Sequence, residues 1–312
     1  MMNLLVFDFG GTSVKYTLWQ EDKILDVSNF LTPKTWEQTK EKILEVKGSY
    51  EKKYQLSGAA FSFPGSVDHE NGEILGNSAI KYIHHFPIQK EISDLLGLPV
   101  AMENDANCAA LAEVWTGGAK GAKDVLFVVV GTGIGGAIVT NGKVQTGAHL
   151  YGGEFGFAYL NYEGESGKRS FSELGTAVYM AKRYCDSIGV PHDTHSGEDV
   201  FSFAEEGDKN AIREVEVFFR YLSIGLFNLQ LSFDPEVIVI GGGISASDEI
   251  IVELEARVND LIKSVGIKDF KTRLLPCFYK NDANLIGAVK NYYDRVGWGR
   301  KNPFKKRLSI QL

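Results

Sequence analysis

Four polar residues in one short segment could act on a hydroxyl group. Glu103, Asn104, Asp105 and Asn107 follow an apolar run and precede a stretch with helical spacing. A helix cap would account for Asn104 or Asp105, but not for all four residues. A carboxylate held at such a junction can accept a hydrogen bond from a hydroxyl group and take its proton as the oxygen attacks phosphorus.

Two glycine-rich turns could hold phosphate groups. Residues 10–12 read Gly-Gly-Thr and residues 131–136 read Gly-Thr-Gly-Ile-Gly-Gly. A dinucleotide fingerprint is disfavoured for the second turn, because a strand over residues 137–140 follows it where that motif needs a helix. Glycines leave backbone N–H groups open to phosphate oxygens. Each turn alone could equally be a tight hairpin, but a third glycine run at 241–243 favours a polyphosphate site.

Two charged residues flank the first turn. Asp8 lies at the end of the strand before it and offers a hard oxygen ligand for Mg²⁺. We expect a water molecule between them, because Mg²⁺ keeps much of its hydration shell. Lys15 follows the turn and could offset phosphate charge.

The order of the predicted elements places these residues at the ends of strands. Strands are predicted over residues 3–9, 14–19, 23–31, 57–63, 99–103, 124–130, 137–140 and 237–240, and helices over 35–53, 88–96, 105–115, 208–231, 248–265 and 283–295. Strands followed by helices occur twice, which predicts two α/β lobes. Gly-Thr recurs between strands at 11–12 and 131–132, which indicates that the two lobes are built alike.

Domain boundaries follow from this order. We expect an N-terminal lobe over residues 1–114 that is joined by the C-terminal helix 283–296, and a C-terminal lobe over 115–282. Residues 297–312 contain five basic residues and no acid, which is typical of a solvated basic tail.

Composition excludes several classes of protein. The 312 residues are 44% apolar and 23% charged, as in globular proteins, and the net charge of −7 gives no overall positive field for nucleic acid. The longest fully apolar run, residues 125–130, is too short to span a membrane. The N-terminus lacks a basic start, and Cys108, Cys185 and Cys277 are too scattered for a disulfide framework. We therefore expect a cytoplasmic protein with a small-molecule partner.

The motifs together resemble those of the ROK family (repressors, open reading frames, kinases). Residues 8–15 (Asp-Phe-Gly-Gly-Thr-Ser-Val-Lys) resemble its first phosphate loop, 103–107 its catalytic segment, 131–136 its second phosphate loop and 241–245 its adenosine loop. The resemblance extends to about Arg295, with the motifs in the family's order. It implies the α/β fold of actin, Hsp70 and sugar kinases (ribonuclease H-like), with a cleft between two lobes. It also implies an ATP-dependent kinase that phosphorylates the 6-hydroxyl of a hexose or hexoside.

The resemblance further implies roles for individual residues. Asp105 would be the catalytic base, and Asn104, Glu154 and Glu173 would bind sugar hydroxyls beside Gly65. The residues implied for ATP are Asp8, Gly10, Gly11, Thr12, Lys15, Gly131, Thr132, Gly133, Gly135, Gly241, Gly242 and Gly243, with Asp8 also holding Mg²⁺ through water.

This sequence differs from many family members at the positions that bind zinc in them. Those proteins bind structural zinc with a His after the Gly-Glu-x-Gly segment and a Cys-rich motif, but Phe157 stands in the place of the His. No Cys lies between Cys108 and Cys185, and zinc needs about four N or S ligands, so no zinc is expected. This zinc-free pattern resembles bacterial β-glucoside kinases, with glucokinase and N-acetylmannosamine kinase as alternatives. The missing His suggests an open site around C1 of the sugar.

Two other classes of protein are disfavoured. ROK repressors carry an added N-terminal winged helix, whereas the first strand here is expected to begin at residue 3. A catalytically inactive sugar-binding protein would not need Asp105 and both phosphate loops. The expected partners are a sugar and ATP, with no nucleic acid and no membrane, and a homodimer stays open.

Overall fold

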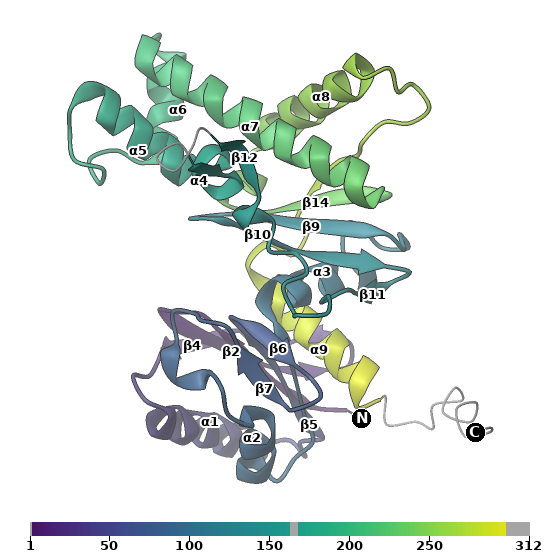
Figure 1. Cartoon of the computed structure of the whole chain (residues 1–312). Coiled ribbons are helices and arrows are strands. Elements are labelled where there is room, and N and C mark those ends of the chain that lie inside the picture. The colour runs from purple at the N-terminus through teal and green to yellow at the C-terminus, as the bar shows by residue number, and fades with distance from the viewer. Residues whose placement is uncertain (1, 163–167, 298–312) are drawn as a thin grey trace. The chain divides into compact units, whose positions relative to one another are not determined.

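The computed structural model describes residues 2–162 and 168–297, which form two compact units (Figure 1). The first unit contains residues up to Ala112 and the segment that starts at Asn281, and the second contains Glu113–Lys280. Within the described residues, no helix is long and apolar enough to cross a membrane. The basic tail expected over 297–312 lies, except for residue 297, outside the described residues.

The first unit is built on a sheet of mixed direction. Its strands are β1 (Leu4–Phe9), β2 (Ser13–Gln20), β3 (Lys23–Ile24), β4 (Ser28–Leu31), β5 (Gly58–Phe63) and β8 (Val100–Asn104). The order is β3-β2-β1-β5-β8, with β4 also paired to β2. β1, β5 and β8 run parallel, so their carboxyl ends share one edge of the sheet. The short strands β6 (Ser66–Asp68) and β7 (Glu73–Leu75) form a separate hairpin.

Helices cover both faces of this sheet. They are α1 (Trp36–Glu51), α2 (Ile88–Leu96), the 3₁₀ turn η1 (Lys81–Ile83), α9 (Ala283–Arg295) and the first part of α3 (Asp105–Trp115). Phe7 of β1 packs in one apolar cluster with Ile43 of α1 and Ile88 of α2. Successive residues of a strand face opposite sides, and Asp8 contacts Asn284 of α9. α9 therefore covers the face opposite to α1 and α2.

The second unit repeats the same sheet arrangement. Its strands are β9 (Val125–Val130), β10 (Ile134–Thr140), β11 (Lys143–Val144), β14 (Val237–Gly242) and β15 (Leu274–Pro276), in the order β11-β10-β9-β14-β15. In both units three antiparallel strands in succession are followed by two further strands parallel to the first. The prediction of two similarly built halves is therefore confirmed at the level of topology.

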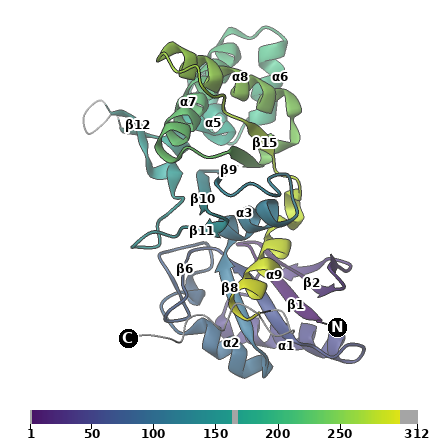
Figure 2. The ribbon, with the colours of Figure 1, turned by 90° about the vertical axis from the view of Figure 1, so that its right-hand side faces the viewer.

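Five helices and a hairpin complete the described part of the second unit. The helices are α4 (Phe171–Gly175), α5 (Ala177–Ile188), α6 (Gly197–Glu205), α7 (Lys209–Phe233) and α8 (Asp248–Ser264), with 3₁₀ turns η2 (Phe155–Phe157) and η3 (Gly243–Ala246); a further turn, η4 (Lys280–Asp282), lies at the boundary of the units. The hairpin consists of β12 (Tyr159–Tyr162) and β13 (Lys168–Ser170). Figure 2 shows β12 outside the layer of helices.

Two of the expected elements differ from the structure. The run 23–31 is not one strand, because β3 pairs with the far end of β2 and β4 with its beginning, so the chain must bend between them. The second glycine turn is shorter than expected: β10 already begins at Ile134, and only residues 131–133 form the turn.

Candidate active site

A row of polar residues crosses the sheet of the first unit near the carboxyl ends of its parallel strands. Lys15 pairs in register with Asp8, Asp8 with Ser62, and Ser62 with Glu103. Ligands of open α/β sheets bind at the carboxyl ends of the strands. The register therefore brings residues from two predicted motifs, the first glycine turn and the segment 103–107, and the unpredicted Ser62, to that edge.

Asp8 is buried within this row. Its Oδ1 accepts hydrogen bonds from Ser62 Oγ at 2.8 Å and from Asn284 Nδ2 at 3.1 Å. Burial raises the pKa of the Asp8 carboxyl, although these two hydrogen bonds and the charge of Lys15 oppose the rise. A buried carboxylate of raised pKa favours a nearby cation, which suits the expected role of Asp8 beside Mg²⁺.

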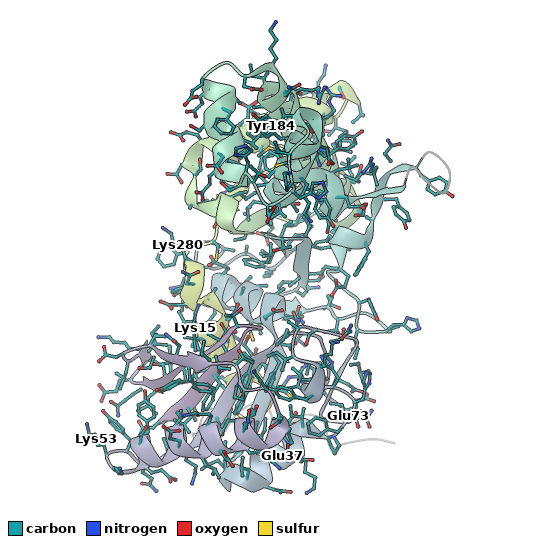
Figure 3. The ribbon with its side chains drawn as sticks, turned by 90° about the vertical axis from the view of Figure 1, so that its left-hand side faces the viewer. Lys15, Glu37, Lys53, Glu73, Tyr184 and Lys280 are labelled. Carbon is teal, nitrogen blue, oxygen red and sulfur yellow. The ribbon has the colours of Figure 1, made fainter. Side chains whose placement is uncertain are left out.

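The first glycine turn is exposed and closed by its own neighbours. Gly10 N donates to Ser13 O at 3.0 Å, and Thr32 Oγ1 donates to Gly10 O at 2.6 Å. Lys15 Nζ donates to the backbone oxygen of Asn281 at 2.8 Å; Figure 3 labels Lys15. These contacts hold the turn and Lys15 in place at one edge of the first unit.

Asn104 and Asp105 stand where β8 passes into α3. Asn104 Oδ1 accepts from the amide of Asn107 at 3.1 Å, which is the bond of a helix cap. Its Nδ2 donates to Asp105 Oδ1 at 2.9 Å and to Gly65 O at 3.0 Å. Asp105 Oδ1 also accepts from the amide of Ala106 at 2.8 Å. The side chain of Asn104 thus connects two other residues of the expected sugar site, Asp105 and Gly65.

Gly65 is needed at its position for conformation and for space. Its φ is +104°, and a Cβ there would lie 2.8 Å from Ile74 and 2.9 Å from His84. Only glycine adopts this conformation readily. The carbonyl of Gly65 is thereby presented to Asn104.

Glu103 holds the segment that is expected to be catalytic through hydrogen bonds to both of its carboxylate oxygens. Its Oε1 accepts from the amide of Asn104 at 2.8 Å and from Asn107 Nδ2 at 3.0 Å, and its Oε2 lies 2.9 Å from His69 Nε2. Burial by itself would raise the pKa of Glu103, but the hydrogen bonds from His69, Asn107 and Asn104 hold it below its usual value. His69 is missing from the sequence prediction, because no local pattern links it to a segment more than thirty residues away.

In the second unit two glycine segments lie beside each other. Gly242 pairs in register with Val130, the residue that precedes the turn at 131–133. Its φ is +82°, and a Cβ there would lie 2.1 Å from Val130 O. Gly131 and Gly243 have open space where a Cβ would stand, so a ligand can approach the backbone there. The two segments fit a polyphosphate held by backbone groups.

A second set of glycines packs the Glu154 loop onto β10. A Cβ on Gly153 would lie 2.2 Å from Gly136 O, and a Cβ on Gly156 would lie 2.1 Å from Ile134 O. The amide of Ile134 donates to Ser172 Oγ of α4 at 2.9 Å. These contacts therefore connect β10, the Glu154 loop and α4 within one unit.

The two acids expected to bind sugar differ in their surroundings. The side chain of Glu154 is exposed, yet desolvation by the surrounding protein raises the pKa of its carboxyl. The carboxylate of Glu173 accepts from the amide of Ser170 at 2.7 Å, while Ser170 Oγ accepts from the amide of Glu173. This capping box lowers the pKa of Glu173 through the bond from the Ser170 amide. Residues 170–173, Ser-Phe-Ser-Glu, carry the sequence signature of that box.

Within the described residues, no group of three or more His, Cys, Asp or Glu side chains could hold a metal ion. Mg²⁺ that arrives with a nucleotide does not need such a group, because water and phosphate oxygens fill most of its coordination. The hard oxygen of Asp8 fits that mode of binding.

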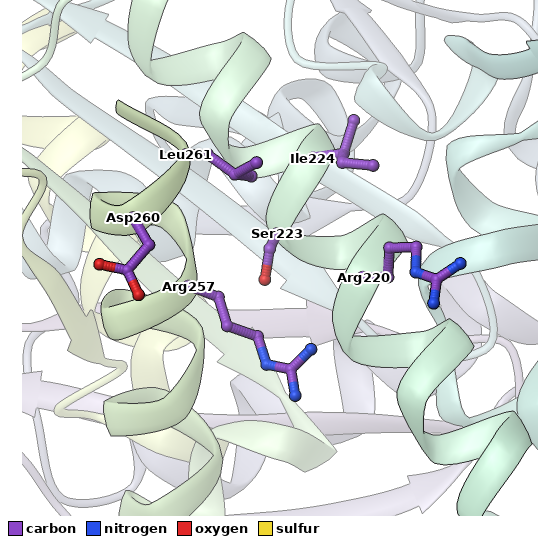
Figure 4. A pocket seen from close by; sticks show the side chains of 6 residues that line it. All are labelled: Arg220, Ser223, Ile224, Arg257, Asp260 and Leu261. Carbon is purple, nitrogen blue, oxygen red and sulfur yellow. The ribbon is translucent and has the colours of Figure 1, made fainter. Parts of the chain in front are cut away.

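A cavity of about 310 Å³ in the second unit lies apart from all these motifs (Figure 4). It lies between α7 and α8 and is lined by Arg220, Ser223, Ile224, Arg257, Asp260 and Leu261. Its Arg257 is already bound by both oxygens of Glu216 at 2.9 Å. None of the expected site residues lines this cavity.

Comparisons with known proteins agree with the fold and the motifs. The ROK family model matches residues 5–293. A β-glucoside kinase from Listeria monocytogenes is 34% identical over 93% of this chain and 97% of its own. A ROK family protein from Streptococcus pneumoniae, solved in complex with sucrose, is 33% identical with a TM-score of 0.85 over 94% of this chain and 98% of its own. A Listeria monocytogenes protein proposed to be an N-acetylmannosamine kinase is 32% identical. Its TM-score is 0.83, over 95% of this chain and 100% of its own.

The matching sheets, the glycine turns at strand ends and these likenesses define an ATP-dependent carbohydrate kinase of the sugar-kinase fold. The fold class expected from the sequence is therefore confirmed. The chain belongs to the ROK family.

Proposed function

We propose that the protein transfers the γ-phosphoryl group of ATP to the primary 6-hydroxyl of a β-glucoside. The observation that carries this proposal is the position of Asp105 at the start of α3, with one carboxylate oxygen held by Asn104 Nδ2 and the Ala106 amide. The kinship to β-glucoside kinases supports the choice of substrate.

Asp105 would act as the general base. The two hydrogen bonds to Oδ1 orient its carboxylate, and the N-terminus of a helix stabilises the negative charge. As the 6-hydroxyl attacks phosphorus, Asp105 would take its proton, and little covalent chemistry by the protein is needed beyond this step and positioning.

The sugar would be held by hydrogen bonds to Asn104, Glu154 and Glu173, with Gly65 beside it. Glu173 keeps acceptor capacity for a hydroxyl although it is part of a capping box, because a carboxylate has about four lone-pair sites. The bond from Asn104 Nδ2 to Gly65 O would fix the amide in the orientation that the sugar meets.

ATP would be held by the expected glycine segments together with Lys15. Open space beside the backbone of Gly131 and Gly243 would let it approach, although the amide of Gly131 itself donates to Gly133 O at 2.9 Å. Bound Mg²⁺ would offset charge on the phosphates, and Asp8 would face its water shell. The three cysteines are free and buried, which is compatible with a reducing cytoplasm, where we place the reaction.

Glucose and N-acetylmannosamine are the alternative acceptors, and the second is favoured by the likeness to the Listeria protein proposed to phosphorylate it. The sucrose complex of the Streptococcus pneumoniae relative supports an acceptor with a substituted C1. Measured kcat/KM for glucose, N-acetylmannosamine and β-glucosides in an ADP-release assay would decide among them.

The variant Asp105→Asn tests the assigned base. We expect kcat to fall at least about 100-fold while calorimetry still detects sugar binding, because an amide cannot accept the proton. Asp94→Asn, at an exposed position on α2, serves as the matched control and should keep full activity. Near-normal turnover by Asp105→Asn would contradict the assignment.

A further inference from the structure

Exposed aromatic side chains surround Glu154 in the sequence. Tyr151, Phe157, Tyr159 and Tyr162 are 59%, 74%, 60% and 58% exposed. Single exposed apolar side chains are common on proteins, but neighbouring ones mark binding surfaces. We call these four residues the aromatic patch.

Local hydrogen bonds bring two members of the patch close to Glu154. The amide of Glu154 donates to Tyr151 O at 3.2 Å, and the amide of Phe157 donates to Glu154 O at 3.4 Å. Each bond closes a turn in which residues three apart lie near each other. Tyr151 and Phe157 therefore flank Glu154 on either side along the chain.

A bulge in the neighbouring hairpin arranges the other two. The register between β12 and β13 shifts between Tyr159 and Asn161. Tyr159 and Tyr162 would face opposite sides of a regular strand, but the bulge lets their rings approach to 6.2 Å at an angle of 48°. Bulges commonly redirect a side chain toward a site.

The loop that carries Glu154 and Phe157 is held rigidly. A Cβ on Gly153 or Gly156 would collide with the backbone of β10, and the amide of Phe171 donates to Ala158 O at 2.7 Å. The loop thus needs little ordering when a ligand binds, and preorganised aromatic side chains bind at low entropic cost.

We propose that the aromatic patch binds the ring attached to C1 of the sugar, the aglycone of an aryl β-glucoside or the second pyranose of a disaccharide. Both ligands share one chemistry, a ring with an apolar face of C–H groups or π electrons, which packs on the face of an aromatic side chain. Tyrosine hydroxyls can also bond sugar hydroxyls. The inference rests on the proposed function, because it needs a β-glucoside as substrate and Glu154 beside the sugar.

The test compares acceptors that do and do not carry such a ring. Wild type, Phe157→Ala, Tyr159→Ala and the double variant are assayed with glucose, methyl β-glucoside, phenyl β-glucoside and cellobiose. We expect each single variant to lower kcat/KM about twofold to tenfold for phenyl β-glucoside, cellobiose or both, mainly through KM, and the double variant about tenfold or more. Glucose and methyl β-glucoside should change less than about twofold. The arms with phenyl β-glucoside and cellobiose separate aryl from pyranose recognition.

Phe278→Ala is the matched control, because Phe278 is a similarly exposed phenylalanine of the second unit outside the patch. It should not discriminate among the acceptors. An equal loss for all four acceptors in the patch variants would overturn the inference, since it would indicate a structural role of the loop. A change of oligomeric state in sedimentation would also overturn it, since the patch would then be a subunit interface.

The same assays distinguish a failure of the proposed function from a failure of the inference about the aromatic patch. If the wild type phosphorylates glucose or N-acetylmannosamine but no β-glucoside, the substrate assignment is wrong and the inference falls with it. If the wild type phosphorylates β-glucosides and the patch variants treat all acceptors as it does, the inference alone is wrong.

Discussion

His69 Nε2 lies 2.9 Å from Oε2 of Glu103, and this contact joins the loop between β6 and β7 to the segment that carries Asp105. The other carboxylate oxygen of Glu103 accepts from Asn104 and Asn107. One buried carboxylate thus ties the segment 103–107 to the hairpin of β6 and β7.

The low pKa of Glu103 predicts how stability depends on pH. The pKa of the Glu103 carboxyl is lower in the folded state than its value near 4.5 in the unfolded chain. The ionised carboxylate therefore stabilises the fold at pH values above about 4.5, and this contribution is lost as the pH falls through the folded pKa. We expect Glu103→Gln to reduce the free energy of unfolding at pH 7 by about 1–3 kcal/mol. In urea titrations the difference from wild type should shrink below about pH 4.

The exposed Glu37 on α1 provides the control for that experiment. Glu37→Gln should change the free energy of unfolding little at either pH. A Glu103→Gln effect of equal size at pH 7 and at acidic pH would contradict the role assigned to the ionised carboxylate.

For Asp8 we expect the opposite dependence of stability on pH. Burial raises its pKa in the folded state, so the unfolded chain ionises first, near 3.8, and the charged carboxylate costs stability above that pH. Asp8→Asn should therefore raise the free energy of unfolding at pH 7 in the absence of nucleotide. Activity should fall about 10–100-fold, as for other residues that support a metal through its ligands. Lower stability of Asp8→Asn at pH 7 would show that its charge is compensated in the fold.

Gly153 and Gly207 form a matched pair for testing the loop of Glu154. Their φ angles are +97° and +94°, but a Cβ on Gly153 would meet Gly136 O at 2.2 Å, whereas a Cβ on Gly207 would meet nothing within 4 Å. Gly207→Ala should cost about 1 kcal/mol of backbone strain. Gly153→Ala should lower Tm further and raise KM for the sugar, because the loop must move away from β10. Similar effects of both substitutions would refute a specific role of the close contact.

Glu113 is predicted to stabilise the second unit where the chain enters and leaves it. Its fully buried carboxylate accepts from the amides of Gly118, Phe278 and Tyr279 and from Cys277 Sγ. Glu113→Ala would leave one buried donor, Cys277 Sγ, and three partly buried amides without this acceptor, at up to about 1–3 kcal/mol for each. We expect a large drop in Tm by calorimetry.

Glu236 supplies the comparison for this prediction, because it also accepts from two backbone amides but is exposed. Water can replace its carboxylate, so Glu236→Ala should lower Tm much less. Equal losses in the two variants would argue against burial as the reason.

Much of the fold could be predicted from local signals. The periodicity of 105–115 and 283–295 corresponds to α3 and α9 within the described residues, because helices repeat a pattern over several turns. The run 23–31 was predicted as one strand and is two, because its residue types suit a strand throughout and only the pairing partner decides where it bends. The short strands β12, β13 and β15 carry too few residues for an alternating pattern to stand out.

By itself, the sequence determined the glycine turns and the strand-to-helix junction at Asp105, because each depends on residues adjacent in the chain. It also indicated the likeness of the two halves, because the same short pattern recurs between strands. Only the tertiary structure decided which side chains meet. Asn284 reaches Asp8 across 276 positions, and Gly153 meets Gly136 through the backbone. Such contacts depend on strand register and on the packing of α9. No local pattern specifies them, because the segments that meet are distant in the chain. Register decides which side chains meet, because a shift of one residue would turn every side chain of a strand to the other face.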